Sequence, residues 1–351
     1  MNGDALMPLP GAPAAARAYR FRAGVARVSR PGGMVLVAPE DGRALRVSAV
    51  AQDLLPLLAD GASFDELLAR LRERHPRAGD AESKLRAFLD QLDRSGLLGT
   101  AAEKPMRRVA TARWPLIDAD PLARAVARVL QRLPQPAGWL LLGLLGAAAL
   151  AAVVMLAFSP RLPHPGALFA QFSAWGLAIF VFGVVVLHEA AHAVACRLAG
   201  VPVGDAGLIF HGGVMPGPYV NTSHLYRVER RAPRFWVAAA GPLVDFLALG
   251  AAAAWLLATD DPASAAAQAA ATLFLLCAAF LYLDTNPLTP SDGSRMVEAL
   301  LGDELARRSA LTRRRARLSG WKTVAWYRIA CSTHLQLSAG LLFGWWMLAQ
   351  H

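Results

Sequence analysis

Residues 139–158 read WLLLGLLGAAALAAVVMLAF and contain no charged side chain. About 20 such residues in an α-helix cross the roughly 30 Å hydrocarbon core of a bilayer, so this stretch predicts a membrane span. Residues 167–187 are likewise uncharged and predict a second span. Further candidates are residues 235–258, broken only by Asp245, residues 263–283, and residues 330–349, which His334 and Gln336 interrupt. The sequence therefore predicts a mainly α-helical polytopic membrane protein with about five transmembrane helices.

The composition of the whole chain agrees with a membrane class. With 55% hydrophobic and only 18% charged residues, the 351-residue chain is too apolar for an ordinary soluble protein. Its three cysteines, Cys196, Cys277 and Cys331, show no paired spacing, which excludes a disulfide framework and a thiolate zinc finger. The net charge of +10 is compatible with nucleic-acid binding or with basic cytoplasmic loops. Because the basic residues lie beside the spans, we expect the lipid bilayer as partner and no nucleic acid.

The same basic residues predict the orientation of the spans. Arg and Lys are abundant before the first span and after the second and fourth, whereas the loop after the first span holds only Arg161. Since cytoplasmic loops collect positive charge, the N-terminus and the ends of the second and fourth spans should face the cytoplasm. Asp4 and three nearby prolines leave no apolar signal-peptide core at the N-terminus.

The composition changes near residue 135, which divides the chain into domains. Residues 25–28, 34–39 and 44–47 are strand-like, and Ser63-Phe64-Asp65-Glu66 is a capping box that opens a helix. We therefore predict a disordered N-terminus over residues 1–18 and a small soluble α+β domain over 19–100. A basic juxtamembrane linker over 101–138 and a membrane domain over 139–351 complete the prediction.

The second predicted span ends on His188-Glu189-Ala190-Ala191-His192. On a helix the two histidines share one face, with a carboxylate between them, as in metal-dependent proteases. From composition alone this pattern arises in roughly one such chain in 200. The alternative is a set of interfacial polar residues that cap a buried helix, but three ionisable groups beside a membrane segment are costly unless something compensates them.

A catalytic zinc site normally takes three protein ligands, so two histidines need a partner. The end of the fourth span supplies Asp284 and Asp292, within a segment that prolines interrupt. The predicted topology brings this segment and the histidines to the same side of the membrane. Either aspartate is therefore a candidate ligand, and turn formation is the alternative role for each.

Across about residues 170–300 the chain resembles the site-2 protease family of intramembrane zinc metalloproteases. The resemblance rests on His188-Glu189-x-x-His192, on Ala240-Gly241-Pro242 and on Asn286-Pro287 followed by Asp292-Gly293. It implies one Zn²⁺ per chain, bound by His188, His192 and Asp292, with Asp284 as the alternative third ligand. It also implies that Glu189 is the catalytic base and that Asn286 lies near the cleft and contacts substrate.

The chain departs from that family where Asp245 follows Gly241-Pro242, because the family has asparagine there. Substrate binding and a helix–helix hydrogen bond are both open for Asp245. Residues 201–222 are rich in Gly and Pro and predict a re-entrant or membrane-edge hairpin, in which Asn221 is a candidate substrate-binding residue. His211, His224 and Cys196 are better explained by local hydrogen bonding or packing than by metal ligation.

The soluble domain resembles PqqD-like domains, which have a winged-helix fold and grip the leaders of ribosomally made peptides. Together the two resemblances imply a peptide zinc metalloprotease of a bacterial inner membrane, which hydrolyses a peptide bond in a peptide or membrane-protein substrate. Two alternatives remain: release of a membrane-tethered regulator, and a non-catalytic zinc-containing component for peptide binding or export. The oligomeric state is not predicted.

Overall fold

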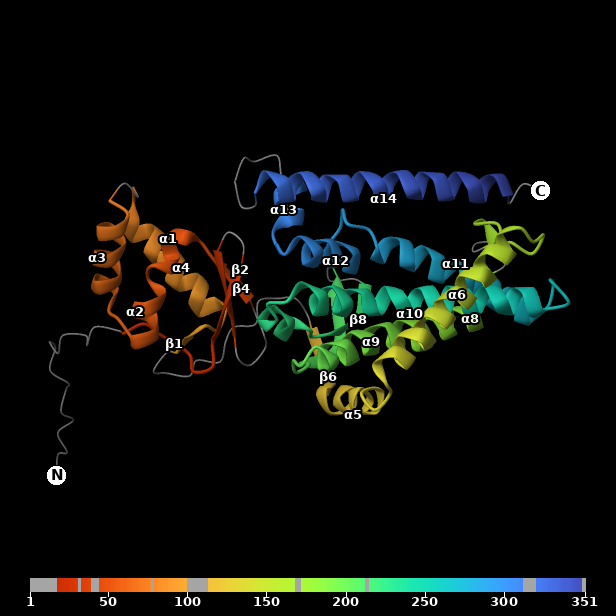
Figure 1. Ribbon diagram of the computed structural model, residues 1–351, viewed down its shortest axis with the longest axis horizontal. Helices are drawn as coiled ribbons and strands as arrows, with labels where there is room; N and C mark the ends of the chain where they lie inside the picture. The colour runs from red at the N-terminus through yellow and green to blue at the C-terminus, as the bar shows by residue number, and fades with distance from the viewer. Residues whose placement is uncertain are drawn as a thin grey trace, which may run out of the picture. The chain divides into compact units, whose positions relative to one another are not determined.

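The computed structural model describes residues 18–30, 33–38, 44–76, 79–99, 113–167, 172–211, 215–311 and 320–348 (Figure 1). The chain forms two compact units, Met1–Arg108 and Val109–His351. The predicted disorder of the N-terminus falls almost entirely outside the described residues.

The strands of the first unit form two small antiparallel sheets. One joins β2 (Ala26–Arg30), β3 (Gly33–Val37) and β4 (Ala44–Val47) in the order β2-β3-β4. The other pairs β1 (Arg20–Phe21) with β5 (Leu98–Gly99). All three predicted strands are present, and their boundaries agree with the sequence to within two residues.

Four helices cover these strands: α1 (Ala49–Gln52), α2 (Leu55–Asp60), α3 (Phe64–Arg74) and α4 (Ala81–Arg94). The predicted capping box opens α3, since Ser63 Oγ accepts from the Glu66 amide and Glu66 accepts from the Ser63 amide at 2.7 Å. The leucines that recur at helical spacing, among them Leu67 and Leu85, form the buried core. The prediction of a small α+β domain is confirmed.

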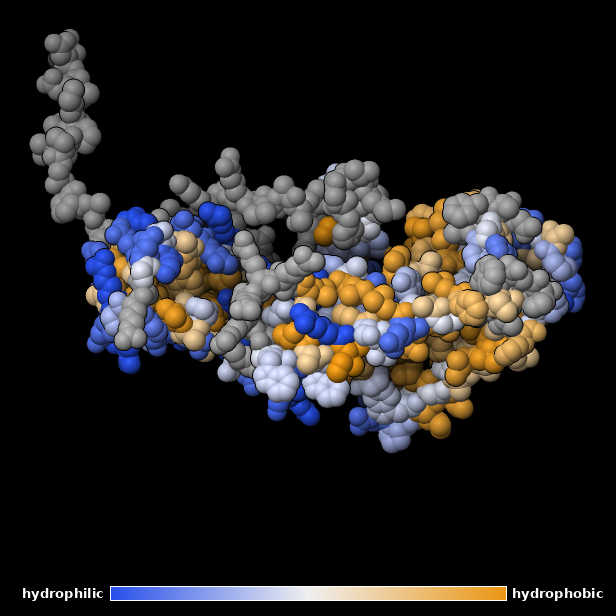
Figure 2. Space-filling model, turned by 90° about the horizontal axis from the view of Figure 1, so that it is seen from above, coloured by the Kyte–Doolittle hydropathy of each residue, from blue (hydrophilic) through white to orange (hydrophobic). Residues whose placement is uncertain are grey.

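Within the described part of the second unit, four helical segments are long and apolar enough to cross a membrane. They are α6 (Gln135–Ala157), the continuous stretch Ala174–Leu198, α10 (Arg231–Ala258) and α11 (Ala265–Asp284). The stretch Ala174–Leu198 comprises α8 (Ala174–Ile179), the π-helical turn η1 (Phe180–Val184) and α9 (Val185–Leu198). On the face drawn in Figure 2, hydrophobic residues gather over the helices of this unit. The mainly helical, multi-span architecture agrees with the sequence.

Two predicted spans differ from the structure. The second, expected over residues 167–187, begins at Ala174 and continues to Leu198, so the histidine motif lies inside the helix and not at its end. Buried partners of the polar side chains, described below, allow the helix to continue.

The fifth predicted span, expected over residues 330–349, lies in α14 (Trp321–Leu348). This helix is long enough to cross a membrane but is not among the four apolar segments. His334 and Gln336 lie within the predicted stretch and lower its mean hydropathy.

Helix α10 is the centre of the second unit, because it packs against α6, α9, α11 and α12 (Asp292–Leu301) (Figure 1). Small residues permit close approach, as at Gly250, where a Cβ would overlap Ala149 of α6. Beyond α12, the short helix α13 (Ala306–Leu311) packs against α14. The central position of α10 lets it contact both the histidine helix and the aspartate helix.

Residues of the predicted linker fold onto the second unit. Strand β6 (Arg113–Asp118) pairs with β7 (Asp205–His211), which pairs with β8 (Met215–Val220), so the predicted hairpin is part of a three-stranded sheet. Helix α5 (Asp120–Leu130) packs against α9. Asp120 fixes this contact, because its carboxylate pairs with Arg197 and accepts from the Val203 amide at 2.9 Å.

Candidate metal centre

Helix α9 places the two histidines of the motif side by side. His188 and His192 are one turn apart, and their Nε2 atoms lie 3.1 Å from each other. Both side chains are buried, with 3% and 6% of their surface exposed. The i, i+4 spacing therefore produces the shared face that the sequence predicts.

Asp292, the first residue of α12, completes the group. Its Oδ2 atom lies 2.7 Å from His192 Nε2 and 3.3 Å from His188 Nε2, and the side chain is buried. These two nitrogens and the carboxylate oxygen form a group that could hold a metal ion. The predicted third ligand thus lies beside both imidazoles, although it is 100 residues from His192 in sequence.

The start of α12 explains how Asp292 reaches this position. Ser291 Oγ accepts from the Ser294 amide, and Ser294 Oγ accepts from the Ser291 amide, so the two serines cap the first turn. A Cβ on Gly293 would overlap the carbonyl of Thr285, at the end of α11. In the Asp-Gly pair, Asp292 therefore supplies the carboxylate, and Gly293 allows the start of α12 to pack against the end of α11.

Helix α10 holds both imidazoles through their other nitrogens. His188 Nδ1 lies 2.9 Å from Asp245 Oδ2, and His192 Nδ1 lies 2.7 Å from the Val237 carbonyl oxygen. A carboxylate and a carbonyl oxygen only accept, so each Nδ1 carries the proton. Each Nε2 lone pair is then directed toward Asp292, as a metal ligand requires.

The geometry fits a small cation. In a tetrahedral zinc site, ligand atoms about 2.05 Å from the metal lie roughly 3.3 Å from one another. The Nε2 atoms of His188 and His192 and the Oδ2 atom of Asp292 are 2.7–3.3 Å apart, so their largest separation equals this value. Asp284 Oδ2 is buried, has no hydrogen-bond partner and lies 3.7 Å from His188 Nε2. An unpartnered carboxylate oxygen is costly beside this group unless a cation or a bound water compensates it.

Asp284 remains the alternative ligand. It forms a second candidate group with His188 and Asp245, but that group shares His188 with the first. Asp292 approaches both imidazoles more closely than Asp284 approaches His188. The shorter distances favour the group that contains Asp292.

Gly241 leaves room for the centre. A Cβ at this position would overlap Nε2 of both His188 and His192. The backbone of α10 therefore passes directly against the atoms that face the candidate cation. The glycine of Ala240-Gly241-Pro242 is explained by this close approach.

The charge of Asp292 suits ligation. Burial alone would raise the pKa of its carboxyl, but nearby positive charge, including that of Arg295, lowers the pKa below its ordinary value. Asp292 is therefore an anion at neutral pH, the form that binds a metal ion.

Glu189, between the two histidines, lies at the boundary between α9 and the three-stranded sheet. Its side chain is half-buried, and its carboxylate interacts with the backbone amide of Val220 on β8. Glu189 is not a member of either candidate metal group. The Glu189 carboxylate is thus near the candidate cation site but is not one of the candidate ligands. It can therefore accept a proton, as a general base must.

The three predicted substrate-binding residues have internal partners. Asp245 is completely buried against His188, which supports the helix–helix hydrogen bond over substrate contact. Asn221 donates to Asp205 at 3.0 Å and accepts from the Ser223 amide, closing the base of the hairpin. Asn286 accepts from the Leu288 amide at 2.9 Å and so shapes the loop before α12. Their substrate-binding roles stay predictions.

A cavity of about 140 Å³ lies beside His192. It is lined by segments of α10, α12 and the 3-10 turn η2 (Ser223–Arg227), and its polar lining includes Arg234 and Arg295. The cavity therefore places open space with a polar lining directly beside one of the two candidate histidine ligands.

Sequence reasoning did not identify the carbonyl of Val237 as a partner of His192, because a backbone group leaves no signal in the sequence. Cys196 is buried in an apolar cluster and belongs to neither metal group, in line with the packing interpretation. His224 is also absent from both groups, whereas the side chain of His211 lies outside the described residues.

Comparison with known families identifies the first unit only. Residues 33–98 match the family model described as Coenzyme PQQ synthesis protein D (PqqD). No curated protein and no solved structure matches the chain. The predicted PqqD-like domain is therefore confirmed, and it indicates peptide binding in a peptide-maturation context. The comparisons do not show a site-2 protease or a zinc metalloprotease.

Proposed function

We propose that the chain is a membrane-embedded zinc metalloendopeptidase that processes a ribosomally made peptide bound by its PqqD-like domain. The observation that carries the proposal is the convergence of His188, His192 and Asp292 from two helices, with Glu189 alongside. Two imidazoles and one carboxylate are a common ligand set of catalytic zinc, which keeps a fourth position for water. The match of residues 33–98 to PqqD supports a peptide as substrate.

When bound, zinc would polarise the scissile carbonyl and lower the pKa of water. The residues of the chain supply the remaining functions. Glu189 takes the proton of the attacking water and delivers it to the leaving amine nitrogen. Asp245 and the Val237 carbonyl keep the two imidazoles in the tautomer that binds the metal.

Strand β8 supports binding of an extended substrate. It lies at one edge of the sheet in the order β6-β7-β8, and the Val220 backbone contacts Glu189. A peptide that pairs with this edge would be unwound, which exposes carbonyls that a helix hides in its own hydrogen bonds. The basic residues beside the spans support a cytoplasmic N-terminus and site.

The test is a cleavage assay with the full chain in a bilayer and a precursor peptide encoded beside its gene. Glu189→Gln should keep one zinc per chain and abolish cleavage, because the amide cannot accept the proton. Asp261→Asn, an exposed change in the loop between α10 and α11, should cleave like the wild type. Cleavage by Glu189→Gln at the wild-type rate would refute the assignment.

The same purified chain and precursor peptide distinguish two other functions from peptide processing. Cleavage of a membrane-tethered regulator but not of the precursor would indicate regulated release. Zinc and precursor binding without hydrolysis would indicate a non-catalytic peptide-binding or export component.

A further inference from the structure

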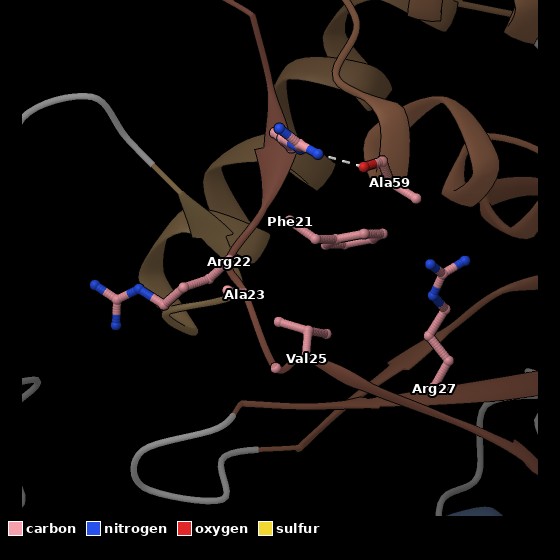
Figure 3. A pocket seen from close by; sticks show the side chains of 8 residues that line it. Phe21, Arg22, Ala23, Val25, Arg27 and Ala59 are labelled. Carbon is pink, nitrogen blue, oxygen red and sulfur yellow. Dashed lines mark hydrogen bonds between the residues drawn. The ribbon is translucent and has the colours of Figure 1, made fainter.

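The first unit contains a cavity that the proposed hydrolysis does not use. Its volume is about 460 Å³, and it lies among β1, the following turn, the start of β2 and the end of α2 (Figure 3). Ligand sites in proteins commonly enclose about 300–1,000 Å³. The cavity is therefore large enough for one or two amino-acid side chains.

Every charged residue that lines this cavity is an arginine: Arg20, Arg22 and Arg27. The Nε of Arg20 donates to the Ala59 carbonyl at 3.3 Å, which leaves its terminal nitrogens for other acceptors. Arg20 and Arg27 form no ion pair with any carboxylate in the described part of the chain. Within the described residues, the cavity thus presents the positive charges of Arg20 and Arg27 without a carboxylate paired to either of them.

The arginines surround an apolar surface. Phe21 and Val25 are half-buried and pack against the core of the unit, and the Arg27 guanidinium lies 5.8 Å from the centre of the Phe21 ring. In Figure 3 the guanidinium groups of Arg22 and Arg27 flank Phe21 and Val25. The lining therefore offers charge-assisted hydrogen bonds next to an aromatic face.

We propose that this cavity binds an acidic segment of a peptide, with Asp or Glu carboxylates on Arg20 and Arg27 and an adjacent apolar side chain on Phe21 and Val25. The inference rests on the peptide-binding role proposed above and names the substrate class. Residues 20–27 precede the segment 33–98 that matches PqqD. The three arginines of the cavity therefore lie outside the matched segment, although Ala59 of the lining lies within it.

A nucleic acid is the less suitable ligand. Phosphate backbones are bound by cations distributed along a groove or stripe, whereas here the cations surround a single concave apolar surface. Guanidinium groups match carboxylates in a bidentate geometry, and the apolar floor has a counterpart in a side chain of a peptide.

The experiment measures binding by the full chain in detergent, independently of cleavage. The probe is a fluorescein-labelled dodecapeptide of alternating Glu and Leu, with a Gln-and-Leu dodecapeptide as the neutral control. The double variant Arg20→Gln/Arg27→Gln should bind the acidic peptide about tenfold more weakly than the wild type, because two charge-assisted contacts are lost. Arg72→Gln, an exposed arginine on α3, is the matched control and should bind like the wild type.

Equal binding of the Glu and Gln peptides, or equal loss in the Arg72→Gln control, would overturn the proposal. Stronger competition by duplex DNA or by phosphatidylglycerol vesicles than by unlabelled acidic peptide would also overturn it, in favour of a phosphate-bearing ligand. Glu189→Gln should bind the acidic peptide normally, so failure of catalysis and failure of this site are distinguishable.

Discussion

His188 Nδ1 lies 2.9 Å from the Asp245 carboxylate, although the two residues are 57 positions apart and belong to different helices. The carboxylate is fully buried in α10, and its other oxygen has no hydrogen-bond partner. This contact links the orientation of the first candidate ligand to the central helix of the second unit. It gives Asp245 a positioning role.

Asp245→Asn should therefore weaken metal binding without removing the ligands. The asparagine amide still offers an acceptor oxygen but lacks the negative charge that stabilises the Nδ1 proton of His188. Hydrogen-bond partners of metal-ligating histidines commonly contribute about 10–100-fold to metal affinity. Zinc content after dialysis against graded chelator measures the effect. Asp260→Asn, an exposed change in the loop after α10, should bind zinc like the wild type. An unchanged zinc affinity in Asp245→Asn would contradict the positioning role.

Gly241→Ala should abolish metal binding. The new methyl group would overlap both Nε2 atoms, and the packed backbone of α10 cannot move away without disturbing its other contacts. Elemental analysis of the purified variant should find much less than one metal ion per chain. The matched control is Gly143→Ala on α6, where an added Cβ meets no atom within 4 Å. Normal metal content in Gly241→Ala would show that the imidazoles rearrange.

Glu298 should make stability depend on pH. Burial raises its pKa to about 7 from 4.5, against the lowering effects of the Arg307 amide and charge. Below pH 4.5 the carboxyl is protonated in both the folded and unfolded states. As pH rises from 4.5 to 7 the unfolded state ionises first, so the folded state loses stability, by at most about 3 kcal/mol.

Glu298→Gln removes this titration. Its melting temperature should match that of the wild type at pH 4.5 and exceed it at pH 8, as measured by thermal unfolding in detergent. Glu229→Gln, at an exposed position, is the control and should show no such divergence. A constant difference between Glu298→Gln and the wild type across the pH range would contradict the prediction.

One face of α5 should lie in the lipid interface. Leu122 and Val129 are 64% and 60% exposed on one side of the helix, whereas Arg124 and Arg128 lie on another side and Ala123 and Ala127 pack inward. The span α6 begins at Gln135, shortly after α5 ends. An amphipathic helix in this position buries its apolar face among the lipid headgroups and upper acyl chains.

The prediction is tested with a fluorophore attached to Leu122→Cys or Arg124→Cys in phosphatidylcholine–phosphatidylglycerol vesicles. The native cysteines are buried and should not react. The probe at position 122 should be quenched by nitroxide lipids and that at position 124 by aqueous iodide. Equal iodide quenching at both positions would show that the apolar face is not in lipid.

Local patterns determined much of the fold. The uncharged stretches identified four apolar helices, and the capping box at Ser63 and the strand-like runs before it identified the first unit. These features depend on neighbours within a few residues, so periodicity and composition reveal them. The same reasoning misplaced the second span, because it treated His188 and Glu189 as an end of the membrane segment.

Only the tertiary structure decided how the candidate centre is assembled. From the sequence, Asp284 and Asp292 were both open as third ligands, and Asp245 was open between substrate contact and helix packing. The distances to His188 and His192 favour Asp292 and give Asp245 an interior partner. Such relationships depend on how α9, α10 and α12 pack against one another, and no local pattern encodes that packing. The sequence by itself specified which residues have ligand chemistry and which segments are apolar; the packing of distant helices specified which of those residues meet.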